Sequence, residues 1–144
     1  MKKALGLMVT VVLLVVVVFS FSACGNANAE KQKKLDELMT QYEGVVAQAQ
    51  TEMDKLTGYV EKYEIEGFDE NYTKIKATVE DYVTQKNDIM SSYKQNKDSY
   101  DAAKLDELIT SMQDYISKGT TFVDSLKDTV TQVEELIAAA GTGE

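Results

Sequence analysis

Apolar side chains recur at alternating spacings of three and four residues from Leu35 almost to the end of the chain. This spacing places them on one side of an α-helix, in the a and d positions of a heptad repeat. The first run comprises Leu35, Leu38, Tyr42, Val45, Ala49, Leu56, Tyr59 and Tyr63. A flanking row widens its apolar stripe, as expected for a helix covered by two neighbours; it contains Met39, Val46, Met53 and Val60.

Two further runs follow the same pattern. The second comprises Phe68, Tyr72, Ile75, Val79, Tyr82, Ile89 and Tyr93. Its flanking row is weaker, so the second helix is expected to be the more exposed. The third comprises Leu105, Leu108, Met112, Tyr115, Gly119, Phe122, Leu126, Thr129, Val133 and Leu136. Its flanking row is complete, with Ile109, Ile116, Val123, Val130 and Ile137.

The heptad phase breaks twice, near residues 64–67 and between residues 100 and 105, and these breaks predict the connections. Gly67 is expected to close the first helix and Asp69 to cap the second, while Asp98, Ser99 and Asp101 are capping residues for the third. We therefore predict helices at about 31–64, 69–98 and 102–140, with a flexible tail at 141–144. Short connections between long helices favour antiparallel neighbours.

The predicted fold class is all-α: an elongated, antiparallel up-down-up three-helix bundle with coiled-coil-like heptad packing, about 50 Å long at 1.5 Å per residue. An intermolecular coiled coil of extended helices is the alternative. The segment Lys34–Thr40 returns almost unchanged as Lys104–Thr110, 70 residues later. The first and third helices are thus expected to be parallel, with the repeated turns side by side.

Polar residues interrupt the apolar seams at Glu52, Lys86 and Asn96, which are therefore candidate polar core positions. In an antiparallel hairpin, Glu52 and Lys86 would lie at different levels, so we expect two separate, partly exposed sites rather than a pair. All eight tyrosines fall on a or d positions. They predict either a tyrosine-lined cleft for an apolar or sugar ligand, or a tyrosine-rich core whose hydroxyls reach the surface or bond to these polar residues.

Composition narrows the chemistry, because the chain contains no His, Trp, Pro or Arg and only one Cys. Without His there is no Ser-His or Cys-His relay and no imidazole metal ligand, and without Arg there is no bidentate clamp for phosphate. The acidic pairs lack the spacing of an EF-hand and are typical of solvated helix faces. We therefore expect neither an enzyme nor a metal or other cofactor site.

The amino-terminal segment has the composition of an export signal: Lys2 and Lys3, then an apolar run from Ala4 to Phe21. At its end, Phe21-Ser22-Ala23-Cys24-Gly25 resembles the lipobox of bacterial lipoproteins, with Phe21 where the family usually has Leu. The resemblance covers residues 1–25. It implies that 1–23 is a signal peptide removed between Ala23 and Cys24, that Cys24 carries a diacylglycerol and an N-acyl lipid such as palmitate, and that 24–30 is a short tether.

Two other fates of this segment are compatible with the sequence. Ala27-Asn28-Ala29 has the A-x-A form of an ordinary signal peptidase site, and cleavage there would release a soluble secreted factor beginning at Glu30. Alternatively, the apolar residues from Ala4 to Ala23 are numerous enough to remain as a membrane span.

Charge then limits the partners. After removal of residues 1–23, 13 lysines face 24 Asp and Glu, a net charge of −11. This argues against nucleic acid and against docking on anionic lipid headgroups, so that membrane attachment must come from the lipid. We expect a non-enzymatic lipoprotein, exported to the cell membrane or outer membrane and facing the periplasm or the exterior, that binds a protein partner or a second copy of itself. The alternative is a carrier with a tyrosine-lined pocket.

Overall fold

Three long helices make up the part of the chain that the computed structural model describes, residues 27–63, 65 and 67–141. They are α1 (Ala27–Lys62), α2 (Asp69–Asn96) and α3 (Ala102–Gly141), with a short 3-10 helix, η1 (Lys97–Ser99), after α2. No strand occurs among these residues, and the three helices pack together, which confirms the all-α prediction. The proposed signal peptide, Ala23, Cys24 and the last three residues of the tail lie outside the described residues.

The helix boundaries differ most from the prediction at the beginning of α1. The helix begins at Ala27, so residues 27–30, assigned to the tether, are helical. It ends at Lys62, two residues before the predicted end. At the other connection, α2 ends at Asn96 and residues 97–99 form the separate helix η1. Both ends of α3 lie within one residue of the prediction.

The connection between α1 and α2 turns at Gly67, which has φ of 74°. This left-handed conformation is accessible to glycine without steric strain. The Phe68 amide donates to the Ile65 carbonyl at 3.3 Å. The prediction that Asp69 caps α2 is wrong: Phe68 holds the cap position with near-helical backbone angles and no side-chain cap hydrogen bond. Asp69 instead lies in the first turn, where its negative charge interacts favourably with the positive end of the helix dipole.

Asp101 caps α3, as one of the three predicted capping residues. Its Oδ1 accepts a hydrogen bond from the Lys104 amide at 2.8 Å, and its carbonyl accepts one from the Leu105 amide at 3.0 Å. This arrangement satisfies amide groups that the first turn of a helix leaves without an internal partner. It fixes the point at which the chain enters α3.

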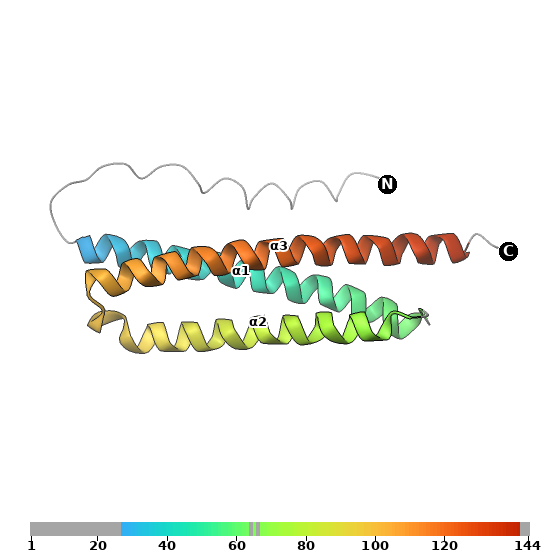
Figure 1. Cartoon of the computed structure of the whole chain (residues 1–144), viewed down its shortest axis with the longest axis horizontal. Helices are drawn as coiled ribbons and strands as arrows, with labels where there is room; N and C mark the ends of the chain where they lie inside the picture. The colour runs from blue at the N-terminus through green and yellow to red at the C-terminus, as the bar shows by residue number, and fades with distance from the viewer. Residues whose placement is uncertain (1–26, 64, 66, 142–144) are drawn as a thin grey trace.

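Figure 1 shows the chain running along α1, returning along α2 and running back along α3. Polar contacts between α1 and α3 join residues 71 to 79 positions apart, which indicates two helices in the same direction. The polar contacts that α1 makes with η1 and α2 join residues that come closer in sequence toward the turn at Gly67: they are Gln32–Lys97, Tyr42–Gln85 and Thr57–Tyr72.

The core divides into two clusters along the length of the bundle. The first has at its centre Leu35, Tyr42, Leu105 and Met112, and the second Ala49, Leu56, Val123 and Leu126. Most buried side chains belong to α1 and α3, whereas Val79 and Tyr93 are the only buried residues of α2. The second helix is therefore the least covered of the three, as the weak flanking row of its sequence predicted.

The two copies of the repeat occupy related but not level positions. Leu35 and Leu105 are both fully buried in the first cluster, and Thr40 and Thr110 each donate to the carbonyl four residues earlier. However, the Lys31–Asp106 and Tyr59–Glu134 contacts both join residues 75 apart rather than 70. The prediction that the repeated turns lie side by side is wrong by more than one helical turn, because the close pairing of the helices sets a different register.

Candidate functional site

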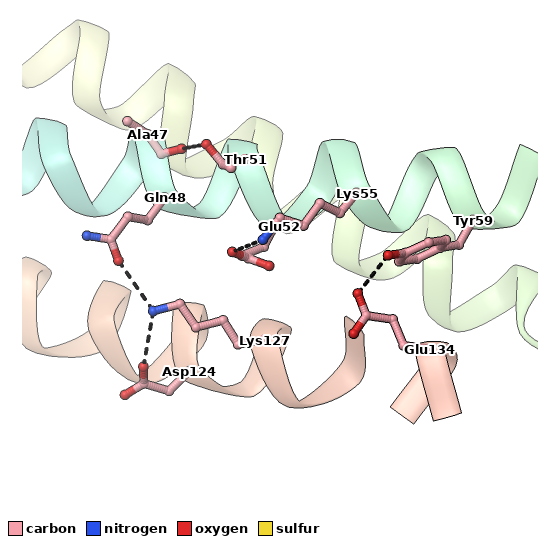
Figure 2. A network of polar contacts seen from close by, with 9 residues as sticks. All are labelled: Ala47, Gln48, Thr51, Glu52, Lys55, Tyr59, Asp124, Lys127 and Glu134. Carbon is pink, nitrogen blue, oxygen red and sulfur yellow. Dashed lines mark hydrogen bonds and ion pairs between the residues drawn. The ribbon is translucent and has the colours of Figure 1, made fainter. Parts of the chain in front are cut away.

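A row of polar side chains lies between α1 and α3 on the surface of the bundle (Figure 2). Lys127 donates to Gln48 at 3.5 Å and lies 3.9 Å from the carboxylate of Asp124. Further along, the Tyr59 hydroxyl donates to the Glu134 carboxylate at 2.6 Å. Most of these groups are exposed, and surface pairs of this kind contribute little to stability. The row therefore covers the seam between the two helices without forming an enclosed site.

Glu52, one of the polar residues that interrupt the seams, is largely enclosed, with 12% of its side chain exposed. Its carboxylate accepts a hydrogen bond from Lys55 at 2.8 Å, on the same face of α1 (Figure 2). Lys86 is half-buried on α2, and no hydrogen bond or ion pair joins it to another described residue. The structure thus keeps Glu52 and Lys86 apart, and the partner of Glu52 lies three residues further along its own helix.

Asn96 does not lie in the core, so its prediction as a polar core position is wrong. The side chain is exposed at the last residue of α2, and its amide donates to the Ser92 carbonyl at 2.8 Å. The carbonyl of Asn96 accepts a hydrogen bond from Ser99 at 2.7 Å. The helix ends here, so the heptad position no longer points at a neighbouring helix, and the residue serves the connection instead.

Seven of the eight tyrosines belong to or pack against the two core clusters, the exception being Tyr63, and four of the hydroxyls bond to neighbouring helices. Besides Tyr59, the Tyr42 hydroxyl donates to Gln85 at 2.9 Å, Tyr72 pairs with Thr57 at 3.1 Å, and Tyr93 reaches the Gln32 carbonyl at 3.4 Å. None of these partners is Glu52, Lys86 or Asn96. No fully buried side-chain oxygen or nitrogen lacks a hydrogen bond in the described part of the chain.

Burial alters the acidity of the tyrosines at the centre of the bundle. It raises the pKa of Tyr42 from 10.0 to about 12, with smaller contributions from the hydroxyls of Tyr82 and Tyr115. Burial and, secondly, the Asp36 carboxylate raise the pKa of Tyr93 further still. The hydrogen bond to Glu134 raises the pKa of Tyr59. Each of these phenols is therefore held in its neutral form.

Alkaline unfolding should depend on Tyr42. Because the pKa of Tyr42 is higher in the folded chain, the unfolded chain loses its proton first, and the free energy of unfolding falls as the pH rises from 10 to 12. We expect a Tyr42→Phe variant to show a shallower fall over this range, measured by urea unfolding at successive pH values. Below pH 9 the two proteins should differ by a constant amount, the loss of the hydrogen bond to Gln85. Parallel decline of the two curves up to pH 12 would contradict the assignment.

An open groove of about 490 Å³ lies between α1 and α2. Its lining residues are Gln50, Met53, Asp54 and Thr57 from α1, and Lys76, Val79, Glu80, Val83 and Thr84 from α2. No tyrosine is among them, so this groove is not the tyrosine-lined cleft that the sequence suggested. The heptad pattern does not predict this groove, although the weak flanking row of α2 indicates that this side of the bundle is thinly covered.

Within 27–63, 65 and 67–141, no group of three or more Asp, Glu, His or Cys side chains is arranged to hold a metal ion. None of the helices described here combines the length and the apolar character that crossing a bilayer demands.

Comparisons with known protein families, with curated proteins and with solved structures gave no match to this chain.

Proposed function

We propose that this chain is a non-enzymatic lipoprotein of the bacterial cell envelope, held at a membrane by lipid on Cys24, whose helical body binds a protein partner. One observation carries the proposal: the only cysteine of the chain directly follows an apolar export segment and the small residues Ser22 and Ala23. A structural disulfide cannot account for a cysteine at this position, since a chain with one Cys forms no internal disulfide.

The beginning of α1 supports cleavage at Cys24 over cleavage after Ala29. The helix begins at Ala27, so the alternative site Ala27-Asn28-Ala29 forms its first turn. Directly after it, Lys31 bonds to Asp106 at 2.6 Å and Gln32 to the Lys97 carbonyl at 2.9 Å. Cleavage at Cys24 leaves this end of the bundle intact.

The proposed body is an up-down-up bundle with heptad packing, arranged as a rod. At 1.5 Å per residue, the 40 residues of α3 would span about 60 Å. In this arrangement the anchor, the beginning of α1 and the connection between α2 and α3 share one end, and the Gly67 turn and the end of α3 share the other. The net charge of −11 would be repelled by anionic headgroups, so the rod would extend away from the membrane while the lipid holds it.

A protein partner suits this surface better than a small ligand. Ligand pockets usually enclose most of the ligand surface, whereas the groove between α1 and α2 is open along its length. The tyrosines that could have lined a ligand cleft pack in the core, and the hydroxyls of Tyr42, Tyr59, Tyr72 and Tyr93 already have partners.

The anchor can be tested by fractionating cells that produce the wild-type chain or a Cys24→Ala variant. We expect the wild-type protein in the membrane fraction, resistant to extraction by high salt. No processed form of the Cys24→Ala variant should remain in that fraction. If the variant were still processed and retained, Cys24 would not be the anchor. If the wild-type protein were found in the medium, the chain would be a soluble secreted factor; if it kept residues 1–23, it would be anchored by a membrane span.

A further inference from the structure

The groove between α1 and α2 has an apolar floor and polar banks. Met53 and Val79 are 6% exposed and Val83 is half-buried, and together they form the floor. Asp54 stands on the α1 bank, and Lys76 and Glu80 on the α2 bank. The lining residues recur at spacings of three and four along each helix, over two helical turns, so the groove is about 10–12 Å long at 1.5 Å per residue.

The two carboxylates beside the floor belong to the majority on this surface, which form no ion pair with a described residue. Elsewhere on the bundle, Glu70, Asp106, Glu107, Asp114 and Asp124 each form an ion pair with a lysine. By contrast, neither Asp54 nor Glu80 is in an ion pair with any residue that the structure describes. Lys76, the one cation of the lining, also lacks an ion pair within the described chain. The lining therefore carries two carboxylates, one on each side of an apolar strip, against one lysine, a net charge of −1.

We propose that this groove binds an amphipathic α-helix of the protein partner, which places apolar side chains over Met53 and Val83 and lysine or arginine side chains against Asp54 and Glu80. The inference rests on the proposed function, since it names the surface and the chemistry by which the body would recognise a protein. A helix fits because two antiparallel helices with regularly spaced side chains form the complementary groove, with anchors at i, i+3 or i+4, and i+7.

Charge complementarity selects a basic helix over a neutral or acidic one. Opposite charges at the rim of an interface steer association and exclude like-charged partners. Here the rim carries Asp54 and Glu80 against the single Lys76, on a body with a net charge of −11. A helix with acidic flanks would bring like charges together on both banks. A basic helix would pair both carboxylates and cover an apolar strip that α2 leaves thinly protected.

The direct test uses the full chain, extracted in neutral detergent, with ¹³C-labelled methionine methyl groups. The probe is a synthetic 14-residue helical peptide with leucines at i, i+4 and i+7 and lysines on both flanks; an otherwise identical peptide carries glutamates in place of the lysines. We expect the lysine peptide to shift the Met53 signal, assigned with Met53→Leu, and to leave Met39 and Met112 unchanged, since these lie in the other core cluster. The glutamate peptide should shift none of them. Equal shifts by both peptides, or no shift of Met53, would overturn the proposal.

Charge reversal gives a second, independent test. A double variant Asp54→Lys with Glu80→Lys should bind the lysine peptide at least tenfold more weakly than the wild-type chain. The matched control is Asp128→Lys with Glu135→Lys on α3, which alters the net charge equally at exposed residues outside the groove. We expect the control to keep most of the affinity. An equal loss of affinity in the two double variants would show that only the overall charge matters, and would overturn the proposal that the groove is the binding site.

These results do not depend on the anchor. Failure of the peptide to bind, together with lipid found on Cys24, would reject the groove and leave the lipoprotein proposal standing. Binding of the peptide at the groove by a chain without lipid would support the groove and reject the lipoprotein proposal.

Discussion

Replacement of Tyr42 by alanine is expected to lower the free energy of unfolding by about 3–5 kcal/mol, the range measured when large aromatic residues are removed from cores. Tyr42 is fully buried at the centre of the first core cluster. Its ring lies 6.0 Å from that of Tyr115, and its hydroxyl bonds across the bundle to Gln85. The variant would lose these contacts and leave a cavity where all three helices meet.

Urea unfolding followed by circular dichroism measures this loss. The matched control is Tyr63→Ala, because Tyr63 is only half-buried and follows the last residue of α1, where Lys62 lies over its ring. We expect the control to lose less than half as much. Similar losses in the two variants would contradict the assignment of Tyr42 to the centre of the core. Since small domains have a total stability of about 5–15 kcal/mol, the loss would be a large fraction of the total, and Tyr42→Ala should unfold at a lower urea concentration.

Replacement of Gly119 by leucine is expected to destabilise the bundle by about 2–3 kcal/mol, although leucine favours helices more than glycine does. Gly119 is buried on α3 where α1 passes close by. A Cβ atom added there would lie 2.8 Å from Cγ1 of Val45 and 3.9 Å from the Tyr42 ring. A larger side chain therefore pushes α3 away from α1, and the two helices that supply most of the core separate.

The same substitution at Gly44 is the control for helix propensity. Gly44 is exposed on α1, and a Cβ atom there would have no neighbour within 4 Å. We expect Gly44→Leu to stabilise the chain by roughly 0.5–1 kcal/mol, because glycine is a poor helix former. Adding Val45→Ala to Gly119→Leu should recover part of the loss at Gly119. Additive effects of the two substitutions would mean that the close approach of Gly119 and Val45 does not limit the packing.

Most of the fold could be predicted because it depends on periodicity. The spacing of Leu35 and the residues that follow placed all three helices, and the break in phase before Leu105 located the turn that Asp101 caps. The alignment of α1 with α3 could not be predicted in the same way. It depends on which side chains fit opposite Gly119, and the repeated sequence suggested an offset of 70, where the polar contacts join residues 71 to 79 apart.

Polar residues were harder to interpret from the sequence than apolar ones. A heptad position reports only which side of a helix a residue occupies. Asn96 lies outside the core because α2 ends there. Glu52 pairs with Lys55, three residues further along the same helix. Lys55 is not part of the apolar seam, so the seam pattern does not predict this pair. The groove beside Asp54 and Glu80 depends on how far α2 lies from α1, a distance that no single segment encodes.

The intact mass of the membrane-extracted protein tests the lipid anchor on Cys24 most directly. We predict a chain that begins at Cys24 and carries the added mass of a diacylglycerol and an N-acyl group. A chain that begins at Glu30 without added mass, or one that retains residues 1–23 without lipid, would contradict the claim.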